Sequence, residues 1–102
     1  MARNNDPPLL ILISLAAGPK HGHALLKDID RFAGVRLGPG ALYGAITRLD
    51  ERGLIEPVPS DDRRRPYRLT AAGAAALAGA VRDLTAITEV ATTRLRTAGV
   101  TA

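Results

Sequence analysis

The stretch that decides the fold is residues 37–58, LGPGALYGAITRLDERGLIEPV. Proline is common at the first position of a helix and glycine just after its last residue, so Pro39 and Gly53 mark the two ends of a helix. At about 100° per residue, the apolar side chains between them share one face: Leu42, Ala45, Ile46 and Leu49. We therefore predict a short amphipathic helix over residues 39–53, with an extended segment directly after it.

A two-stranded hairpin is predicted after this helix, from residues 54–58 and 67–70. Pro57 has no N–H to give to a sheet, which suits an edge strand. The tip of the hairpin carries three adjacent basic residues: Arg63, Arg64 and Arg65. A helix that fits the major groove, beside a basic hairpin that can follow the backbone, indicates a DNA-reading unit.

Further helices are predicted on both sides of this unit. Residues 7–17 are apolar almost throughout, which predicts a helix covered on most sides. Thr70 is expected to cap a last helix that runs to about residue 98. A helix over residues 22–34 has an apolar stripe of Leu25, Ile29 and Phe32. Its other side, expected to be a solvated face, carries Lys27, Asp28, Asp30 and Arg31.

This order of elements predicts a mainly α (α+β) fold, with a winged helix-turn-helix in residues 1–70 and a C-terminal dimerisation helix in residues 71–102 of the same unit. At about 1.5 Å per residue the last helix is roughly 40 Å long, more than the small domain can cover. Its apolar residues recur at alternating spacings of four and three, like a coiled-coil seam: Leu77, Val81, Leu84, Thr88, Ala91 and Leu95. We expect a second copy of the chain to cover this seam, in preference to the helix folding back.

Composition narrows the possible functions. The chain has 102 residues, which suits one small domain, and no cysteine for a disulfide or a thiolate zinc site. Its net charge of +4 comes mostly from arginine, whose planar fork suits phosphate and guanine. Only 3% of the residues are aromatic, which argues against binding single-stranded nucleic acid through stacked bases.

The apolar run at residues 7–17 has a second interpretation, as the core of a signal peptide with Arg3 before it and small residues after it. The run is too short to span a bilayer. Asp6 followed by Pro7 is better explained as a helix cap and a first helical residue. We therefore expect a buried helix in a cytoplasmic protein that has no membrane partner.

Three motifs follow one another in the chain: AGPKHGHALLKDI at residues 17–29, GPGALYGAITRLDERGLI at 38–55 and RPYRLTAAG at 65–73. Together they resemble the PadR-type transcriptional regulators, named for control of phenolic acid decarboxylase, over about residues 9–80. The short C-terminal helix resembles that of the small subgroup. The resemblance implies a homodimeric repressor on a pseudo-palindromic operator in double-stranded DNA, with the helix 39–53 in the major groove, the hairpin as wing and the last helix as dimer interface.

The chain departs from the usual pattern of that family at three positions. Gly38 stands where Ser or Thr often caps the helix, and His23 stands where tyrosine is common. Gly44 stands where proline is common and leaves no side chain on the face expected to meet DNA. These departures bear on the preferred DNA sequence and not on the fold.

DNA contacts are expected from three places. Side chains and backbone on the outer face of the helix 39–53 come from Gly40, Tyr43, Thr47 and Arg48. Tyr43 and Thr47 are expected to define sequence preference, and Arg48 to reach a phosphate or a guanine. Lys20 and His21, before the second helix, are expected to bind phosphate. At the wing tip, a backbone or minor-groove contact is expected from Arg63, Arg64 and Arg65.

These residues also have purely structural interpretations. Tyr43 can pack half-buried against the second helix, and Arg48 can pair with Asp50 or Glu51 on the surface. The arginines of the hairpin tip can form a solvated turn that is partly neutralised by Asp61 and Asp62. The same acidic residues keep open an alternative function, a winged-helix module that binds a protein partner.

No enzyme is expected, because the chain lacks cysteine and shows no Ser/His/acid set. A metal site is not expected either, since His21 and His23 with Asp28 and Asp30 do not form a convergent ligand set. No cofactor is implied. The last helix offers no aromatic side chain on which an aromatic effector could stack. The sequence leaves open whether a small-molecule effector binds elsewhere or in an apolar pocket.

Overall fold

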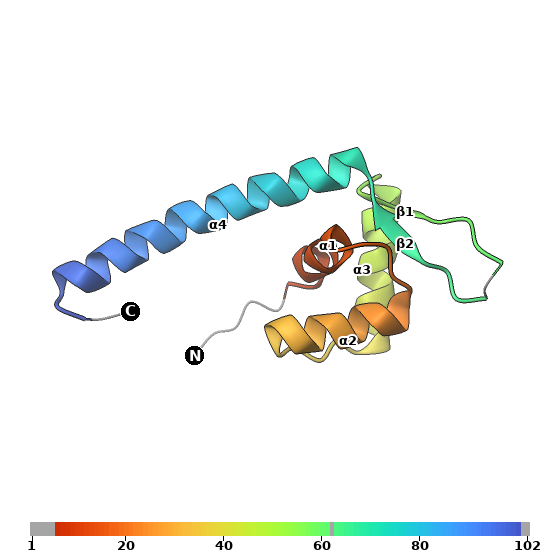
Figure 1. Ribbon diagram of the computed structural model, residues 1–102, viewed down its shortest axis with the longest axis horizontal. Helices are drawn as coiled ribbons and strands as arrows, with labels where there is room; N and C mark the ends of the chain where they lie inside the picture. Colours follow the sequence, from red (N-terminus) through yellow and green to blue (C-terminus); the bar gives the residue numbers. More distant parts are fainter. Residues whose placement is uncertain (1–5, 62, 101–102) are drawn as a thin grey trace.

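The predicted order of elements is confirmed in the computed structural model, which describes residues 6–61 and 63–100. Three helices are followed by a two-stranded antiparallel sheet and a long last helix (Figure 1). In chain order these are α1 (Pro7–Ala16), α2 (Gly22–Ala33), α3 (Pro39–Glu51), β1 (Ile55–Pro57), β2 (Tyr67–Leu69) and α4 (Ala71–Thr97). The fold is therefore mainly α, with the small sheet of a winged helix.

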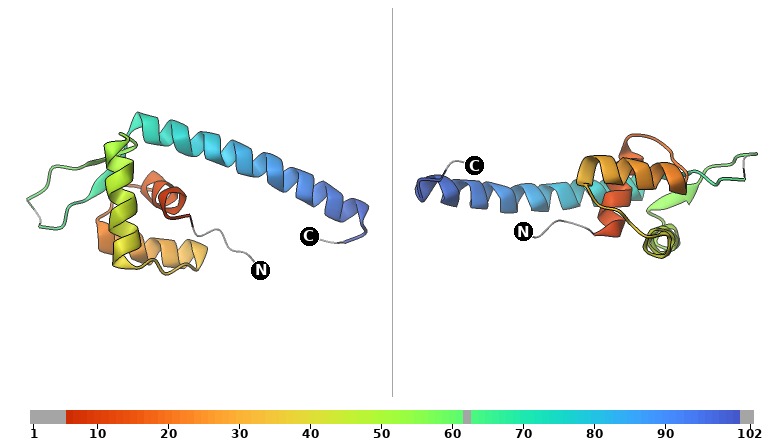
Figure 2. Two further views of the ribbon diagram at one scale, coloured as in Figure 1. Left: turned by 180° about the vertical axis from the view of Figure 1, so that it is seen from behind. Right: turned by 90° about the horizontal axis from the view of Figure 1, so that it is seen from below.

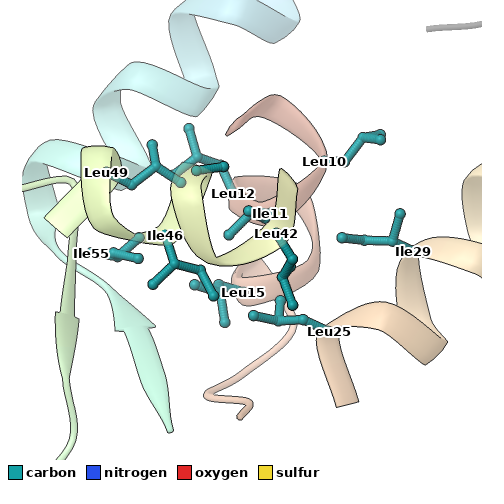
Figure 3. Packing of buried hydrophobic residues seen from close by; sticks show 11 residues of the cluster. Leu10, Ile11, Leu12, Leu15, Leu25, Ile29, Leu42, Ile46, Leu49 and Ile55 are labelled. Atoms are coloured by element: carbon teal, nitrogen blue, oxygen red, sulfur yellow. The ribbon is translucent and has the colours of Figure 1, made fainter. Parts of the chain in front are cut away.

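Helix α1 lies at the centre of the domain. It starts with Asp6 in the N-cap position, although the Asp6 side chain makes no capping hydrogen bond, and Pro7 occupies the first turn. Helices α2 and α3, strand β2 and the first turns of α4 all contact it. Four of its large aliphatic side chains are buried among theirs (Figure 3): Leu10, Ile11, Leu12 and Leu15. No helix in the described part of the chain is both long and apolar enough to cross a membrane.

The predicted inner face of α3 is confirmed, because Leu42, Ala45, Ile46 and Leu49 are all buried. The stripe predicted on α2 is only partly right. Leu25 and Ile29 are fully buried, but Phe32 is 43% exposed. The buried side of α2 continues through Leu26 and Ala33, which pack against the core, so Phe32 falls on the flank of the helix.

The hairpin β1–β2 and its connecting loop 58–66 form the wing. Glu56 pairs with Arg68 in the register of the sheet, and their side chains form an ion pair of 2.8 Å. Strand β2 has a second neighbour that the sequence does not predict. The backbone of Lys20 donates to Tyr67 O at 3.1 Å and accepts from Tyr67 N at 2.9 Å. Strand β1, which carries Pro57, is therefore the edge strand.

Helix α4 is joined tightly to the domain only at its start. Thr70 caps it, because its hydroxyl accepts a hydrogen bond from Gly73 N at 3.0 Å and donates to Gly53 O at 2.6 Å. Gly73 is the buried residue of α4, and a Cβ built on it would overlap the Leu54 carbonyl oxygen. Beyond Leu77, which packs against the core, the helix extends away from the domain (Figure 2).

We predict that Gly73→Ala destabilises the protein by about 1–3 kcal/mol, because the added methyl meets backbone that cannot turn aside. Gly79→Ala is the matched control in the same helix, where the nearest atom to an added Cβ is 3.7 Å away, at the end of the Arg82 side chain. It should stabilise the protein by up to about 1 kcal/mol through helix propensity. Chemical denaturation of both variants measures this; equal effects of the two substitutions would contradict the close approach.

Candidate nucleic-acid interface

One side of the domain holds the wing, the start of α2 and the length of α3. The wing projects beside the start of α2, and the far end of α4 lies on the opposite side (Figure 1). This arrangement follows from the packing of α2 and α3 on α1 and from the bond between β2 and Lys20. It brings together most of the residues that the sequence predicts to contact DNA.

The outer face of α3 is open to solvent. Nothing lies within 4 Å of a Cβ built on Gly40, and the side chains of Thr47 and Arg48 are exposed. The Thr47 hydroxyl donates to Tyr43 O at 2.9 Å, so its oxygen remains available as an acceptor. Among the described residues, Arg48 forms no ion pair with Asp50 or Glu51. Its guanidinium is available to a partner.

Tyr43 is 55% exposed, so it is not a core residue. Its ring nevertheless reaches the start of α2. A Cβ built on Gly22 would lie 2.5 Å from Tyr43 Oη and 3.0 Å from Tyr43 Cζ. The tyrosine therefore extends from α3 toward α2. It contacts the second helix, as one interpretation of the sequence has it, and is still exposed enough to contact DNA, as the other has it.

Lys20 is placed differently from its predicted role. Its ammonium group turns into the domain, where it donates to Ser14 O at 2.6 Å and lies 3.9 Å from Asp28 Oδ2. Only 18% of its side chain is exposed. The neighbouring His21 caps α2, with Nδ1 accepting from Ala24 N at 3.4 Å. Lys20 thus holds the domain together and does not reach outward to a phosphate.

Asp28, the partner of Lys20, does not lie on a solvated face of α2 as predicted. The Asp28 side chain is only 16% exposed and accepts a hydrogen bond of 2.6 Å from Ser14 Oγ, a buried hydroxyl on α1. Arg31 donates to the other carboxylate oxygen at 2.7 Å. The hydrogen bond from Ser14, then the one from Arg31 and the charge of Lys20, lower the pKa of Asp28 below its ordinary value of 3.8.

The wing arginines are exposed and border a hollow of about 410 Å³ between the wing, α3 and the start of α2. Asp61 is not among the residues that line it, and Asp62, the other expected neutralising residue, lies outside the described part of the chain. The lining residues are His21, Gly22, His23, Tyr43, Arg63, Arg64, Arg65 and Tyr67. Within residues 6–61 and 63–100, no three His, Asp or Glu side chains converge as metal ligands would.

A family model described as "Transcriptional regulator PadR-like family" matches residues 11–79, which span α1 to the first turns of α4. The chain belongs to the PadR-like family. This confirms the resemblance found in the three sequence motifs. The family is described as one of transcriptional regulators.

Relatives of this PadR-like protein include the transcriptional regulator Rv3488 of Mycobacterium tuberculosis, 40% identical over 72 residues, which are 68% of this chain and 66% of the relative. The transcriptional activator GvpE2 of Halobacterium salinarum is 36% identical over 70 residues, 69% of this chain and 35% of the relative. An uncharacterised 37.1 kDa protein in transposon Tn4556 of Streptomyces fradiae is 48% identical over 71 residues, 70% of this chain. The matches span only 21% to 66% of these relatives' lengths.

Solved structures show the same fold. A PadR family transcription regulator from Clostridium difficile superposes with a TM-score of 0.78 at 23% identity, over 87% of this chain and 97% of that one. RosR of H. salinarum superposes with a TM-score of 0.66 at 26% identity, over 89% and 76%. The winged helix and the long last helix therefore occur together in other proteins of this fold.

We predict that the PadR-like domain loses about 1–3 kcal/mol of stability at pH 7 when Asp28→Asn removes the charged acceptor of Ser14 and Arg31. Because the pKa of Asp28 is lowered by folding, its carboxylate stabilises the fold above the pKa of the unfolded chain. That contribution is lost as pH falls through the folded pKa. The difference between the two proteins should therefore shrink below about pH 4.

Asp30→Asn is the matched control for this pH dependence. Asp30 is 47% exposed and lies 3.7 Å from the exposed Arg36, so this substitution should change stability little at any pH. Denaturation at pH 7 and at pH 3 measures both variants. A loss for Asp28→Asn that is as large at pH 3 as at pH 7 would contradict the role of the charge.

Proposed function

We propose that this PadR-like protein is a homodimeric regulator that binds a specific pseudo-palindromic sequence in double-stranded DNA. The observation that carries the proposal is the shared placement of the open face of α3 and the three wing arginines on one side of the domain. The reading helix enters the major groove, and the wing follows the backbone. Such a protein acts in the cytoplasm, where bacterial and archaeal DNA lies.

Sequence reading belongs to the exposed outer face of α3. Thr47 and Arg48 offer side chains that fit base edges, with Arg48 suited to guanine. Gly40 presents bare backbone, which allows the helix to approach the groove closely, whereas the Arg48 guanidinium lies 3.5 Å from the place of a Cβ on Gly44. Asp50 and Glu51 repel phosphate, so the end of α3 tilts away from the duplex. The small size of this reading set makes the wing important for overall affinity.

Dimerisation is supported by the exposed apolar side of α4. Val81, Leu84 and Leu95 of the predicted seam are 49%, 43% and 40% exposed. A hollow of about 480 Å³ is lined by Val81 and Leu84, and also by Thr88, whose hydroxyl donates to Leu84 O at 2.7 Å and so needs no partner elsewhere. Large apolar side chains in a row gain about 25 cal/mol for each Å² of apolar area that a second copy covers.

Repression is the direction of control that we propose, because a dimer seated on an operator blocks access to a promoter that overlaps it. The relative GvpE2 is named an activator, so the direction follows from the position of the operator and not from the fold. A reporter fused to the operator and promoter gives the sign directly. Higher expression when the gene is deleted supports repression, and lower expression contradicts it.

A protein-binding module is the alternative function, favoured by the acidic residues near the arginines. Selection of bound duplexes from random DNA separates the two functions. A DNA regulator enriches one sequence with two related half-sites, and its affinity falls steeply with salt. Failure to enrich any sequence, with shallow salt dependence, would favour the protein partner.

We predict that Leu84→Glu gives a monomer that no longer binds the operator, because a charge in the middle of the seam is buried without a partner and both half-sites must be engaged together. Arg82→Glu places the same charge on the opposite side of α4 and should leave the dimer intact. Light scattering combined with duplex binding measures both variants. A monomeric wild type, or a dimeric Leu84→Glu, would overturn the dimer.

We predict that replacing Arg63, Arg64 and Arg65 together by Ala weakens binding to every duplex. The slope of log affinity against log salt should shrink by roughly one to three units, about one for each phosphate that the wing no longer neutralises. Arg36, Arg82 and Arg94, all exposed and away from the wing, provide a triple Ala control with the same change in net charge. An unchanged slope in the wing variant, or an equal change in the control, would show that the wing does not touch the backbone.

A further inference from the structure

The hollow between the wing and the start of α2 gathers rings that are scarce elsewhere in the chain, together with basic groups. The chain has two tyrosines and two histidines in all, and all four residues line this hollow. Three consecutive arginines of the wing complete its wall. None of the described residues that line it carries a carboxylate. A hollow of about 410 Å³ with this lining favours an anion over a cation or an apolar group.

Tyr43 turns its hydroxyl toward this hollow and not along the outer face of α3. Its Oη lies at the place that a side chain on residue 22 would occupy, since a Cβ there would be 2.5 Å from it. Gly22 is buried at the first position of α2, beneath the ring. Thr47, one turn further along α3, bonds Tyr43 O and stays on the open face. The tyrosine hydroxyl thus faces the hollow, and the Thr47 side chain lies on the outer face of α3.

We propose that this hollow binds one phosphodiester group of the DNA backbone, with the Tyr43 hydroxyl as a donor and the wing arginines as the neutralising charge. We call it the phosphate clamp, made of Gly22, Tyr43 and residues 63–65. Phosphate oxygens accept several hydrogen bonds at once, and tyrosine and arginine both donate to them. The proposal rests on the proposed DNA-binding function and makes it more specific.

The clamp changes the role expected for Tyr43. A phosphate contact fixes the register of the protein on the duplex but carries no sequence information. Sequence preference then depends on Thr47 and Arg48 alone. Gly22 acts as a positioning residue, because its bare Cα leaves the space that the tyrosine hydroxyl fills.

The first test is Tyr43→Phe, which keeps the ring and removes only the hydroxyl. We expect affinity for the selected operator and for an unrelated duplex to fall by the same factor, roughly tenfold to a hundredfold, as for the loss of one hydrogen bond to a charged group. Fluorescence anisotropy measures both affinities, and thermal melting should be unchanged. Neutral methylphosphonates placed one at a time along the operator should weaken the wild type most at the clamped phosphate. They should weaken Tyr43→Phe less at that position, because only the contacts of the wing arginines remain to be lost there.

The second test is Gly22→Ala, whose methyl displaces the end of a flexible side chain and should cost little stability. It should lower duplex affinity about as much as Tyr43→Phe does. Combined in one protein, the two substitutions should weaken binding hardly more than either alone, because both remove the same contact. Additive reductions in affinity would mean that Gly22 does not act through the tyrosine.

The outcomes separate the clamp from the function on which it rests. If the wild type binds no duplex, the proposed function itself is wrong. If the wild type binds and Tyr43→Phe binds equally well, or loses affinity for the operator alone, the clamp is wrong, and the second result would assign base reading to Tyr43. Calorimetric binding of inorganic phosphate that needs the Tyr43 hydroxyl, with duplex affinity unchanged, would assign the hollow to a free anion and overturn the clamp.

Discussion

The burial of α1 is the constraint on which the rest of the structure depends. This helix has large aliphatic side chains on nearly every side, and each is worth about 1.5–3 kcal/mol when it leaves water. No single neighbour can cover such a helix, so α2, α3, β2 and the start of α4 each cover a part of it. The direction of α3 and the place of the wing follow from that shared task. The surface proposed to meet DNA is therefore the outer side of the elements that enclose α1.

Local patterns were enough to predict the order of elements and the inner face of α3, because a helix with apolar residues at helical spacing and a glycine end needs no distant partner to be recognised. The exposed face of α3 and the basic wing tip followed from the same patterns. Contacts between distant residues were not predictable in this way. The backbone pairing of Lys20 with Tyr67 joins positions far apart in the sequence. The hydrogen bond from Ser14 to Asp28 likewise joins a helix that looks wholly apolar to a face that looks wholly solvated.

Lys20 shows why counting basic residues is a poor guide to an interface. Its backbone bonds β2, and its ammonium group holds the end of α1 and the Asp28 carboxylate, so one residue ties two helices to the wing. The basic groups left on the outer surface near the wing are arginines, whose forks can hold a phosphate by two bonds at once. Phe32 is the opposite case, since its apolar side chain lies on a flank of α2 that the core does not reach. In both residues the side chain's chemistry suggested one environment, and the backbone geometry imposed another: the bridge to Tyr67 for Lys20 and the helix α2 for Phe32.

The joint between the domain and α4 leaves little freedom of rotation. Thr70 bonds both Gly53, at the end of α3, and Gly73, within α4, while Gly73 itself rests against the Leu54 carbonyl. Two chains paired through α4 would therefore hold their winged helices rigidly apart, at a separation set by the angle at which the long helices cross. A dimer of this kind would select operators by the number of base pairs between the half-sites as well as by the sequence of each half-site. A small molecule bound between the two α4 helices would change their crossing angle, and with it the preferred spacing of the half-sites, without contact with the DNA.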